Sequence, residues 1–146
     1  MEKNISETAE SIMRERFGKD SLIALATVSG GKPYVRAVDS YYEDGCFYVI
    51  TYGLSDKMRH IGENPCVSIC GDWFTGQGRG ESLGYILAEE NREIAEKLKK
   101  AFSAWYNNGH IDEKDLNTCI LKIRLEKGVL FNGGVRYEVD FEEDKG

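Results

Sequence analysis

Two cations and two hydroxyl groups are candidates for an anion-binding site: Arg36, Thr51, Ser55 and Lys57. Arg36 belongs to a predicted strand, and Thr51 ends the next strand of the same predicted hairpin. Ser55 and Lys57 begin a short predicted helix, whose first turn offers free N–H groups and a partial positive charge. Hydroxyls, cations and a helix start together suit a phosphate group. A helix cap with ordinary surface charges is the alternative, and the residues alone leave both open.

A glycine-rich stretch and the two histidines are weaker candidates. Residues 76–80 read GQGRG and look like a phosphate loop. Glu81 stands where the dinucleotide fingerprint has its third glycine, and no helix follows at once, so we expect a flexible turn between strands. His110 and Asp112 have the chemistry of a general-base pair. They lie in a polar turn without a nearby nucleophile, and we expect no catalytic role for them. We expect His60 to be exposed on the short helix.

The cysteines predict reduced, mostly buried thiols. The chain has four of them: Cys46, Cys66, Cys70 and Cys119. Cys66 and Cys70 lie in a strand-like run, in which four residues span roughly 13 Å. That separation is too large for a shared metal ion or a disulfide. We therefore predict no metal site.

Composition indicates an ordinary acidic globular protein. Its 146 residues suit a single domain over residues 1–146, and the formal net charge of -6 with a pI of about 5.0 argues against a nucleic-acid partner. No apolar run approaches the ~18 residues of a membrane span. Residues 1–10 are polar and charged, unlike a signal peptide. We expect a cytoplasmic protein with no membrane partner.

The N-terminal half predicts one helix followed by three strands. Apolar residues at helical spacing predict a helix over residues 4–17, with Asn4 as its cap and Gly18 at its end. The nearly continuous apolar run at residues 21–28 predicts a strand buried on both faces. Turn signals at residues 30–31 and 43–45 separate two further strands, at residues 33–42 and 46–52.

The C-terminal half predicts two helices among four strands. We expect a short helix over residues 55–63, strands over 66–72 and 83–88 around a loop at 73–81, and a long helix over 89–107. Residues 121–126 and 135–142 alternate apolar and polar side chains, which predicts a strand pair with one solvated face. Short consecutive strands joined by turns favour a mainly β fold, an antiparallel split β-barrel with flanking helices.

Three stretches resemble the pyridoxamine 5'-phosphate oxidase-like family, and in particular its small general-stress-protein-like members. They read PYVRAV at residues 33–38, TYGLSDK at 51–57, and NPCV at 64–67 after Ile61. No one of them is unique to the family, but their order and spacing are fairly specific. By motif the similarity covers residues 21–88, and the order of elements extends it over nearly the whole chain.

The resemblance implies an FMN-binding split barrel, usually a homodimer with the flavin at the subunit interface. It implies that Trp73 and Phe74 either cover the flavin ring from the partner subunit or pack in the core. Tyr41 and Tyr42 are expected to be exposed in the same interface. Carried over by position, the cofactor-binding residues are Arg36, Ala37, Val38 and Asp39 along the isoalloxazine edge and phosphate side, Ile50 and Thr51 at the flavin or its ribityl chain, and Ser55 and Lys57 at the phosphate.

Three departures from the better-known oxidases bear on the reaction. Asp56 stands where those oxidases have an arginine, which is unfavourable beside a phosphate unless its side chain points away. Tyr41 replaces a basic residue. Residues 139–142 read VDFE and replace the Arg-Leu-His segment that helps to bind the vitamin substrate. These departures argue against oxidation of pyridoxamine phosphate.

The leading hypothesis is an FMN-dependent oxidoreductase that acts on an unknown small molecule. In such a protein the flavin carries the redox chemistry, so no protein acid or base is named as catalytic. One alternative is a flavin-binding or stress-response protein without turnover. Another is a split barrel that binds haem or a deazaflavin, although the sequence offers no well-placed histidine for axial haem ligation.

Overall fold

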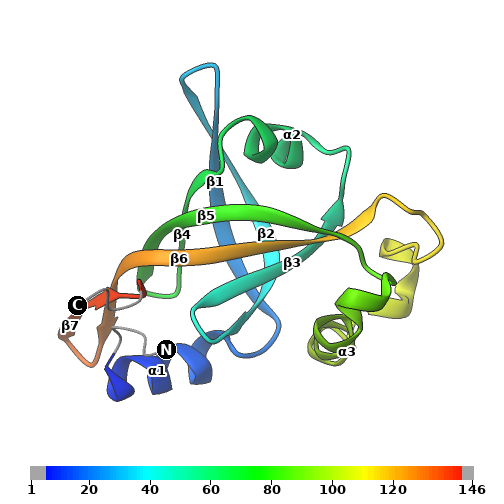
Figure 1. Cartoon of the computed structure of the whole chain (residues 1–146). Coiled ribbons are helices and arrows are strands. Elements are labelled where there is room, and N and C mark those ends of the chain that lie inside the picture. Colours follow the sequence, from blue (N-terminus) through cyan, green and yellow to red (C-terminus); the bar gives the residue numbers. More distant parts are fainter. Residues whose placement is uncertain (1–5, 143–146) are drawn as a thin grey trace.

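Seven antiparallel strands and three α-helices make up residues 6–142, the part of the chain that the computed structural model describes (Figure 1). The helices are α1 (Glu7–Phe17), α2 (Asp56–Glu63) and α3 (Arg92–Ala101). The strands are β1 (Ser21–Ser29), β2 (Lys32–Glu43), β3 (Cys46–Tyr52), β4 (Cys66–Gly71), β5 (Phe74–Tyr85), β6 (Thr118–Asn132) and β7 (Val135–Asp140). A 3₁₀ turn, Glu89–Asn91, precedes α3, and a π turn, Tyr106–His110, follows it.

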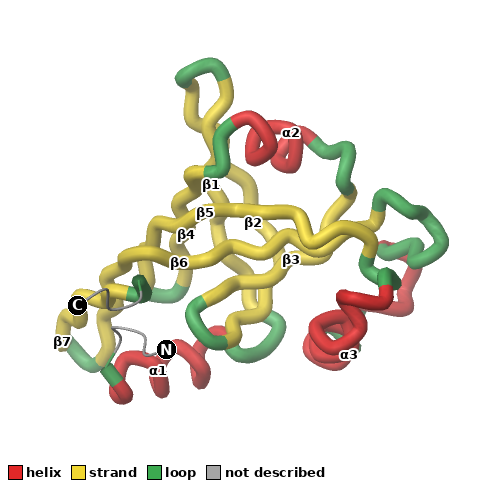
Figure 2. The backbone as a smooth tube through the Cα atoms, in the orientation of Figure 1, coloured by secondary structure: helices red, strands yellow, loops and turns green. Residues whose placement is uncertain are grey.

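The first six strands close into a barrel. Each strand in the order β3-β2-β1-β4-β5-β6 pairs antiparallel with the next, and β6 returns to pair with β3. β7 extends the sheet beyond the barrel by pairing with the far end of β6. Figures 1 and 2 show α1 at the lower end of the barrel, α2 at the upper end and α3 to one side. The predicted antiparallel split barrel with flanking helices is therefore confirmed.

Helix α1 closes the lower end of the barrel. Ser6 caps it by accepting a hydrogen bond from the Ala9 amide at 3.2 Å, and the helix begins at Glu7. The predicted cap, Asn4, lies outside the described residues. The inward-facing Phe17 ring meets the Phe47 ring edge-on, with 5.3 Å between their centroids.

The barrel interior takes one face of each strand, so two predictions about burial are wrong. β1 alternates: Ile23 is buried, whereas Leu22 is 65% exposed because no described element covers that outer face. Tyr42, expected to be exposed at an interface, is buried in the core, and Phe74 takes the core position that had been left open for it. The Tyr42 hydroxyl donates to Glu10. Of the two aromatic residues considered for covering a flavin ring, only Trp73 is exposed.

β5 passes through the segment predicted to be a flexible loop, and the separate strand predicted at residues 83–88 does not form. Three alternate glycines, at positions 76, 78 and 80, face the barrel interior. A Cβ on Gly78 would lie 2.2 Å from the Arg124 carbonyl oxygen, and one on Gly76 would lie 2.8 Å from the Phe74 ring. The glycines serve close packing within the barrel, and the GQGRG stretch is not a phosphate loop.

The helix predicted over residues 89–107 is broken. α3 ends at Ala101, and Phe102 leaves helical geometry with ψ 19°. Trp105 then stacks on Phe102 at 4.8 Å between centroids and donates from Nε1 to Asp20 at 2.8 Å. The apolar face of α3, together with Phe102 and Tyr106, forms a second hydrophobic core on the outer face of the barrel.

A polar contact fixes the segment after α3. The Tyr106 hydroxyl donates to the Glu113 carboxylate at 2.6 Å, and Lys99 forms an ion pair with the same carboxylate at 2.9 Å. Hydrogen bonds from Lys99 and then Tyr106 lower the pKa of Glu113. The contact therefore stabilises the fold in the pH range where Glu113 is charged.

The helices within residues 6–142 are too short or too polar to cross a membrane. The same residues contain no group of three or more His, Cys, Asp or Glu side chains placed to hold a metal ion. All four cysteines are free thiols; Cys46 and Cys119 are buried, whereas Cys66 and Cys70 are exposed on β4.

Candidate functional site

β2, β3 and α2 bring four of the predicted site residues to the upper end of the barrel. Lys57, in the first turn of α2, donates from Nζ to Thr51 Oγ1 at 2.6 Å. Burial lowers the pKa of Lys57, and the nearby positive charge of Arg36 lowers it further. Ser55 is the residue immediately before α2. Residues from one hairpin and one helix start therefore meet as the sequence predicts.

Ser55 has a buried hydroxyl without a hydrogen-bond partner in residues 6–142. A serine before a helix ordinarily accepts a bond from an amide in the first turn, as Ser6 does for α1. Ser55 makes no such bond, although its backbone has the extended geometry of a helix cap, with φ -73° and ψ 161°. A buried polar atom without a partner costs free energy, so this hydroxyl is suited to a ligand that supplies the missing bond.

Arg36 is held at the same end of the barrel by contacts with β1. Its Nη1 donates to the Leu25 carbonyl oxygen at 3.1 Å and to Thr27 Oγ1 at 2.8 Å. Burial lowers the pKa of Arg36, whereas the negative charge of Asp56 raises it. Arginine stays charged in proteins, so this burial means that a cation has lost part of its hydration.

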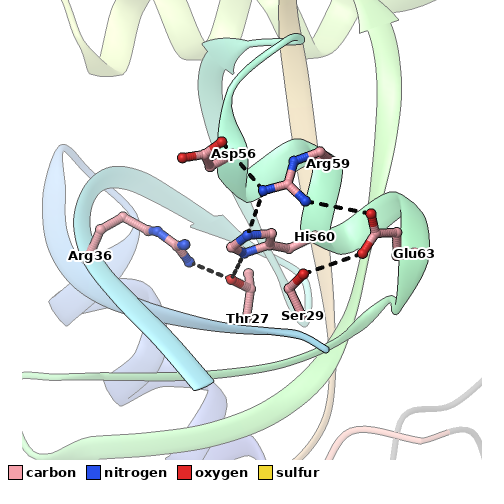
Figure 3. Close-up of polar contacts among 7 residues, drawn as sticks. All are labelled: Thr27, Ser29, Arg36, Asp56, Arg59, His60 and Glu63. Carbon is pink, nitrogen blue, oxygen red and sulfur yellow. Dashed lines mark hydrogen bonds and ion pairs between the residues drawn. The ribbon is translucent and has the colours of Figure 1, made fainter. Parts of the chain in front are cut away.

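The two cations lack an ion-pair partner among residues 6–142. Neither Arg36 nor Lys57 forms an ion pair with a carboxylate anywhere in the described ranges of the chain. Asp56, the nearest acidic residue in sequence, has a side chain that is 86% exposed and pairs with Arg59 at 3.5 Å (Figure 3). Its charge acts on Arg36 from a distance, but the carboxylate forms its ion pair with Arg59 instead. An anion would relieve the repulsion between the two partly buried cations.

The other predicted cofactor-binding residues lie elsewhere on the same strands. Ala37 and Asp39 are exposed on the outer face of β2, and Val38 between them points into the barrel core. Ile50 packs in the second core beside α3. Burial, followed by the proximity of Asp20, raises the pKa of Asp39. These four side chains do not join the cationic cluster.

His110 and Asp112, for which no role was expected, lie next to one part of the cluster. They line a cavity of about 250 Å³ together with Ile50, Thr51 and Tyr52 at the end of β3. His110 is itself exposed. Thr51 therefore borders both this cavity and the cationic cluster.

Thr27, which the sequence did not single out, and His60, which was expected to be exposed, lie beside the cationic cluster. Thr27 is fully buried and lies between Arg36 and His60, whose Nδ1 is 2.8 Å from Thr27 Oγ1 (Figure 3). The prediction of an exposed His60 is wrong, since its exposed fraction is 2%. A signal existed: His60 follows Lys57 by three residues and precedes the buried Ile61, so it shares the buried face of the helix.

Comparison with known families gives one match over most of the chain. A family model described as pyridoxamine 5'-phosphate oxidase matches residues 10–132. A search of curated proteins finds no match.

Solved structures with the same fold include a general stress protein, a protein described as FAD-binding and a haem-binding protein. The General Stress Protein 26 of Bacillus anthracis is 19% identical, with a TM-score of 0.63 over 92% of this chain and 95% of that one. A protein of Mesorhizobium loti described as FAD-binding is 20% identical, with a TM-score of 0.61 over 88% and 96%. A haem-binding protein of Mycobacterium smegmatis is 15% identical, with a TM-score of 0.63 over 84% of this chain and 53% of that one. At these identities the likeness shows the fold alone.

Proposed function

The chain belongs to the pyridoxamine 5'-phosphate oxidase family, and from this we propose that it binds FMN with the phosphate at Arg36, Ser55 and Lys57. The observation that carries the proposal is the buried hydroxyl of Ser55, left without a partner at a helix start. A phosphate oxygen accepts hydrogen bonds from a serine hydroxyl, from helix N–H groups and from cations. The cluster offers all three kinds of donor.

Haem fits these residues less well than a flavin phosphate does. The whole chain has two histidines. His60 is buried, with its ring nitrogens near Thr27 and Arg59, and His110 lies in an exposed turn. Neither lies on the exposed outer face of β1 and β2, whereas haem proteins of several classes use an axial histidine. A deazaflavin phosphate would use the same phosphate-binding residues, so the titration described below includes it.

The outer face of β1 and β2 is a suitable surface for the isoalloxazine ring of the flavin, and in a homodimer the second copy of the chain would cover the ring. Ala37 lies opposite Ala24, Val35 opposite Ala26, and Asp39 opposite Leu22 across the two strands. Leu22 and Val35 are exposed on this mostly apolar face. A flat flavin ring suits such a surface, and a homodimer would cover it from water.

Bound FMN would exchange a hydride or electrons with a small molecule. The protein residues have other tasks: Arg36, Ser55 and Lys57 hold the phosphate, and Thr51 keeps the Lys57 ammonium in place. The oxidoreductase hypothesis concerns an unidentified substrate other than pyridoxamine phosphate, since Tyr41 and Asp56 stand where the better-known oxidases have basic residues. The alternative hypothesis is that the protein binds the flavin but catalyses no reaction.

Titration of the purified chain with FMN, riboflavin, FAD and a deazaflavin phosphate tests the cofactor. We expect one FMN per chain and riboflavin binding at least about tenfold weaker, because riboflavin lacks the phosphate. Equal affinity for FMN and riboflavin would contradict the phosphate site. Anaerobic reduction of bound FMN by a nicotinamide cofactor, followed by reoxidation with candidate acceptors, separates an enzyme from a passive flavin carrier. Light scattering of the FMN complex tests the homodimer.

A further inference from the structure

A continuous chain of polar contacts runs from the anion site, beneath α2, to Arg59 and Glu63 at the surface. Arg36 Nη1 donates to Thr27 Oγ1 at 2.8 Å, Thr27 Oγ1 lies 2.8 Å from His60 Nδ1, and His60 Nε2 lies 3.4 Å from Arg59 Nη2 (Figure 3). Arg59 in turn pairs with Glu63 at 3.6 Å. The chain links β2, β1 and α2, the elements that form the site.

The donors in this chain orient the Thr27 hydroxyl. Arginine has donors only, so Thr27 Oγ1 accepts from Arg36, and we assign the Thr27 hydroxyl proton to a bond with His60 Nδ1. His60 Nδ1 then accepts from the Thr27 hydroxyl, whose oxygen accepts from Arg36. His60 thus holds the Thr27 hydroxyl in the orientation that Arg36 requires.

Thr27 determines which part of the Arg36 guanidinium remains available. Both hydrogens of Nη1 are used, one by Thr27 and one by the Leu25 carbonyl oxygen. Nε and Nη2 have no acceptor among residues 6–142. Three of the five guanidinium N–H groups are therefore free for a ligand. The guanidinium is planar and is fixed through Nη1, so its Nε and Nη2 groups can donate two parallel hydrogen bonds to a phosphate.

We propose that His60 and Thr27 are positioning residues, which orient the Arg36 guanidinium toward the phosphate of the cofactor. The proposal rests on FMN binding as proposed above. Neither residue touches the ligand in this assignment; each acts through Arg36. The polar pair is costly to bury, and apolar side chains would fill the same space without that cost; the bond from Arg36 to Thr27 and the contact between Thr27 and His60 offset that cost.

A purely structural role is the competing explanation. The His60 ring also lies 4.7 Å from the Tyr34 ring, so it contributes to packing beneath α2. Damage to packing would weaken FMN and riboflavin binding alike. Loss of Arg36 orientation would weaken FMN alone, because riboflavin has no phosphate. The ratio of the two affinities therefore separates the explanations.

The test uses three variants of the full chain. Thr27→Val removes the hydroxyl at nearly constant volume, and His60→Phe keeps an aromatic ring beside Tyr34 without nitrogens. Thr27→Ser keeps the hydroxyl and is the matched control. We expect the preference for FMN over riboflavin to fall about tenfold in the first two variants and to persist in Thr27→Ser. If His60→Phe does not fold, Thr27→Val alone decides.

Two results would overturn the proposal, and they differ. If the unaltered chain prefers FMN and Thr27→Val keeps the same preference, the positioning role is wrong and the cofactor assignment stands. If the unaltered chain shows no preference for FMN over riboflavin, the phosphate site itself is wrong and the positioning role falls with it.

Discussion

Replacement of Ser55 by alanine should weaken FMN binding without destabilising the cofactor-free protein. Its buried hydroxyl has no partner in the described part of the chain, so Ser55→Ala removes an unsatisfied group from the cofactor-free protein. The same substitution removes a donor to the bound phosphate. A helix cap would behave differently, because Ser→Ala at a working cap destabilises a protein.

The expected magnitudes follow from the burial. An unsatisfied buried polar group costs about 1–3 kcal/mol, so the cofactor-free variant should be equal in stability to the parent or up to about 1 kcal/mol more stable once the small void is included. A hydrogen bond to a charged group contributes about 1.5–3 kcal/mol. FMN should therefore bind roughly 10- to 150-fold more weakly.

Two assays measure these effects. Urea unfolding of the cofactor-free proteins gives the difference in unfolding free energy, and calorimetric titration gives the FMN dissociation constant. Riboflavin serves as the ligand control, and its affinity should not change. A variant destabilised by about 1 kcal/mol with unchanged FMN affinity would show that Ser55 is an ordinary cap, and the reasoning would be refuted.

Three further substitutions test neighbouring parts of the account. Lys57→Ala should weaken FMN binding by about 1.5–3 kcal/mol in calorimetry and leave the circular dichroism spectrum unchanged; unchanged affinity would remove Lys57 from the site. Asp56→Asn should tighten FMN binding roughly twofold at low salt and less at high salt, because an exposed negative charge near the phosphate is lost; weaker binding would mean that Asp56 supports the site. Glu113→Gln should lower the melting temperature at pH 7, because hydrogen bonds from Lys99 and Tyr106 lower the pKa of Glu113. Because the pKa of Glu113 is lower in the folded protein, the charged carboxylate stabilises the fold at pH values above the unfolded pKa of about 4.3, and this stabilisation is lost as the pH falls through the folded pKa. The difference in melting temperature between the parent and the variant should therefore shrink in acid, and a difference that stays constant would contradict the assignment.

The barrel was predictable because turns and alternation are local signals. The Gly30-Gly31 hairpin lies where expected, and the alternating apolar residues of β6 face the barrel interior. β5 was not predictable from local signals, because three glycines in a strand read as a loop. β6 and the Phe74 ring approach the β5 glycines so closely that a larger side chain would not fit. Such contacts between distant segments leave no local pattern in the sequence. The end of α3 was missed for a similar reason, since Trp105 turns toward Asp20, a residue far away in sequence.

The cationic cluster was predictable, but its supporting residues were not. Arg36, Ser55 and Lys57 belong to motifs with recognisable order and spacing. Thr27 is a polar residue in an apolar strand, and nothing in its neighbours indicates a partner on α2. Only the packing of α2 on β1 brings His60 to it. The direction of Asp56 was equally undetermined, because it depends on the ion pair with Arg59.

A crystal structure of the protein grown with FMN would show directly whether these residues hold the phosphate. We expect phosphate oxygens within hydrogen-bond distance of Ser55 Oγ, Lys57 Nζ and the free edge of the Arg36 guanidinium. We also expect Arg36 Nη1 to remain on Thr27. A flavin bound elsewhere, or a phosphate held without Ser55, would contradict the account.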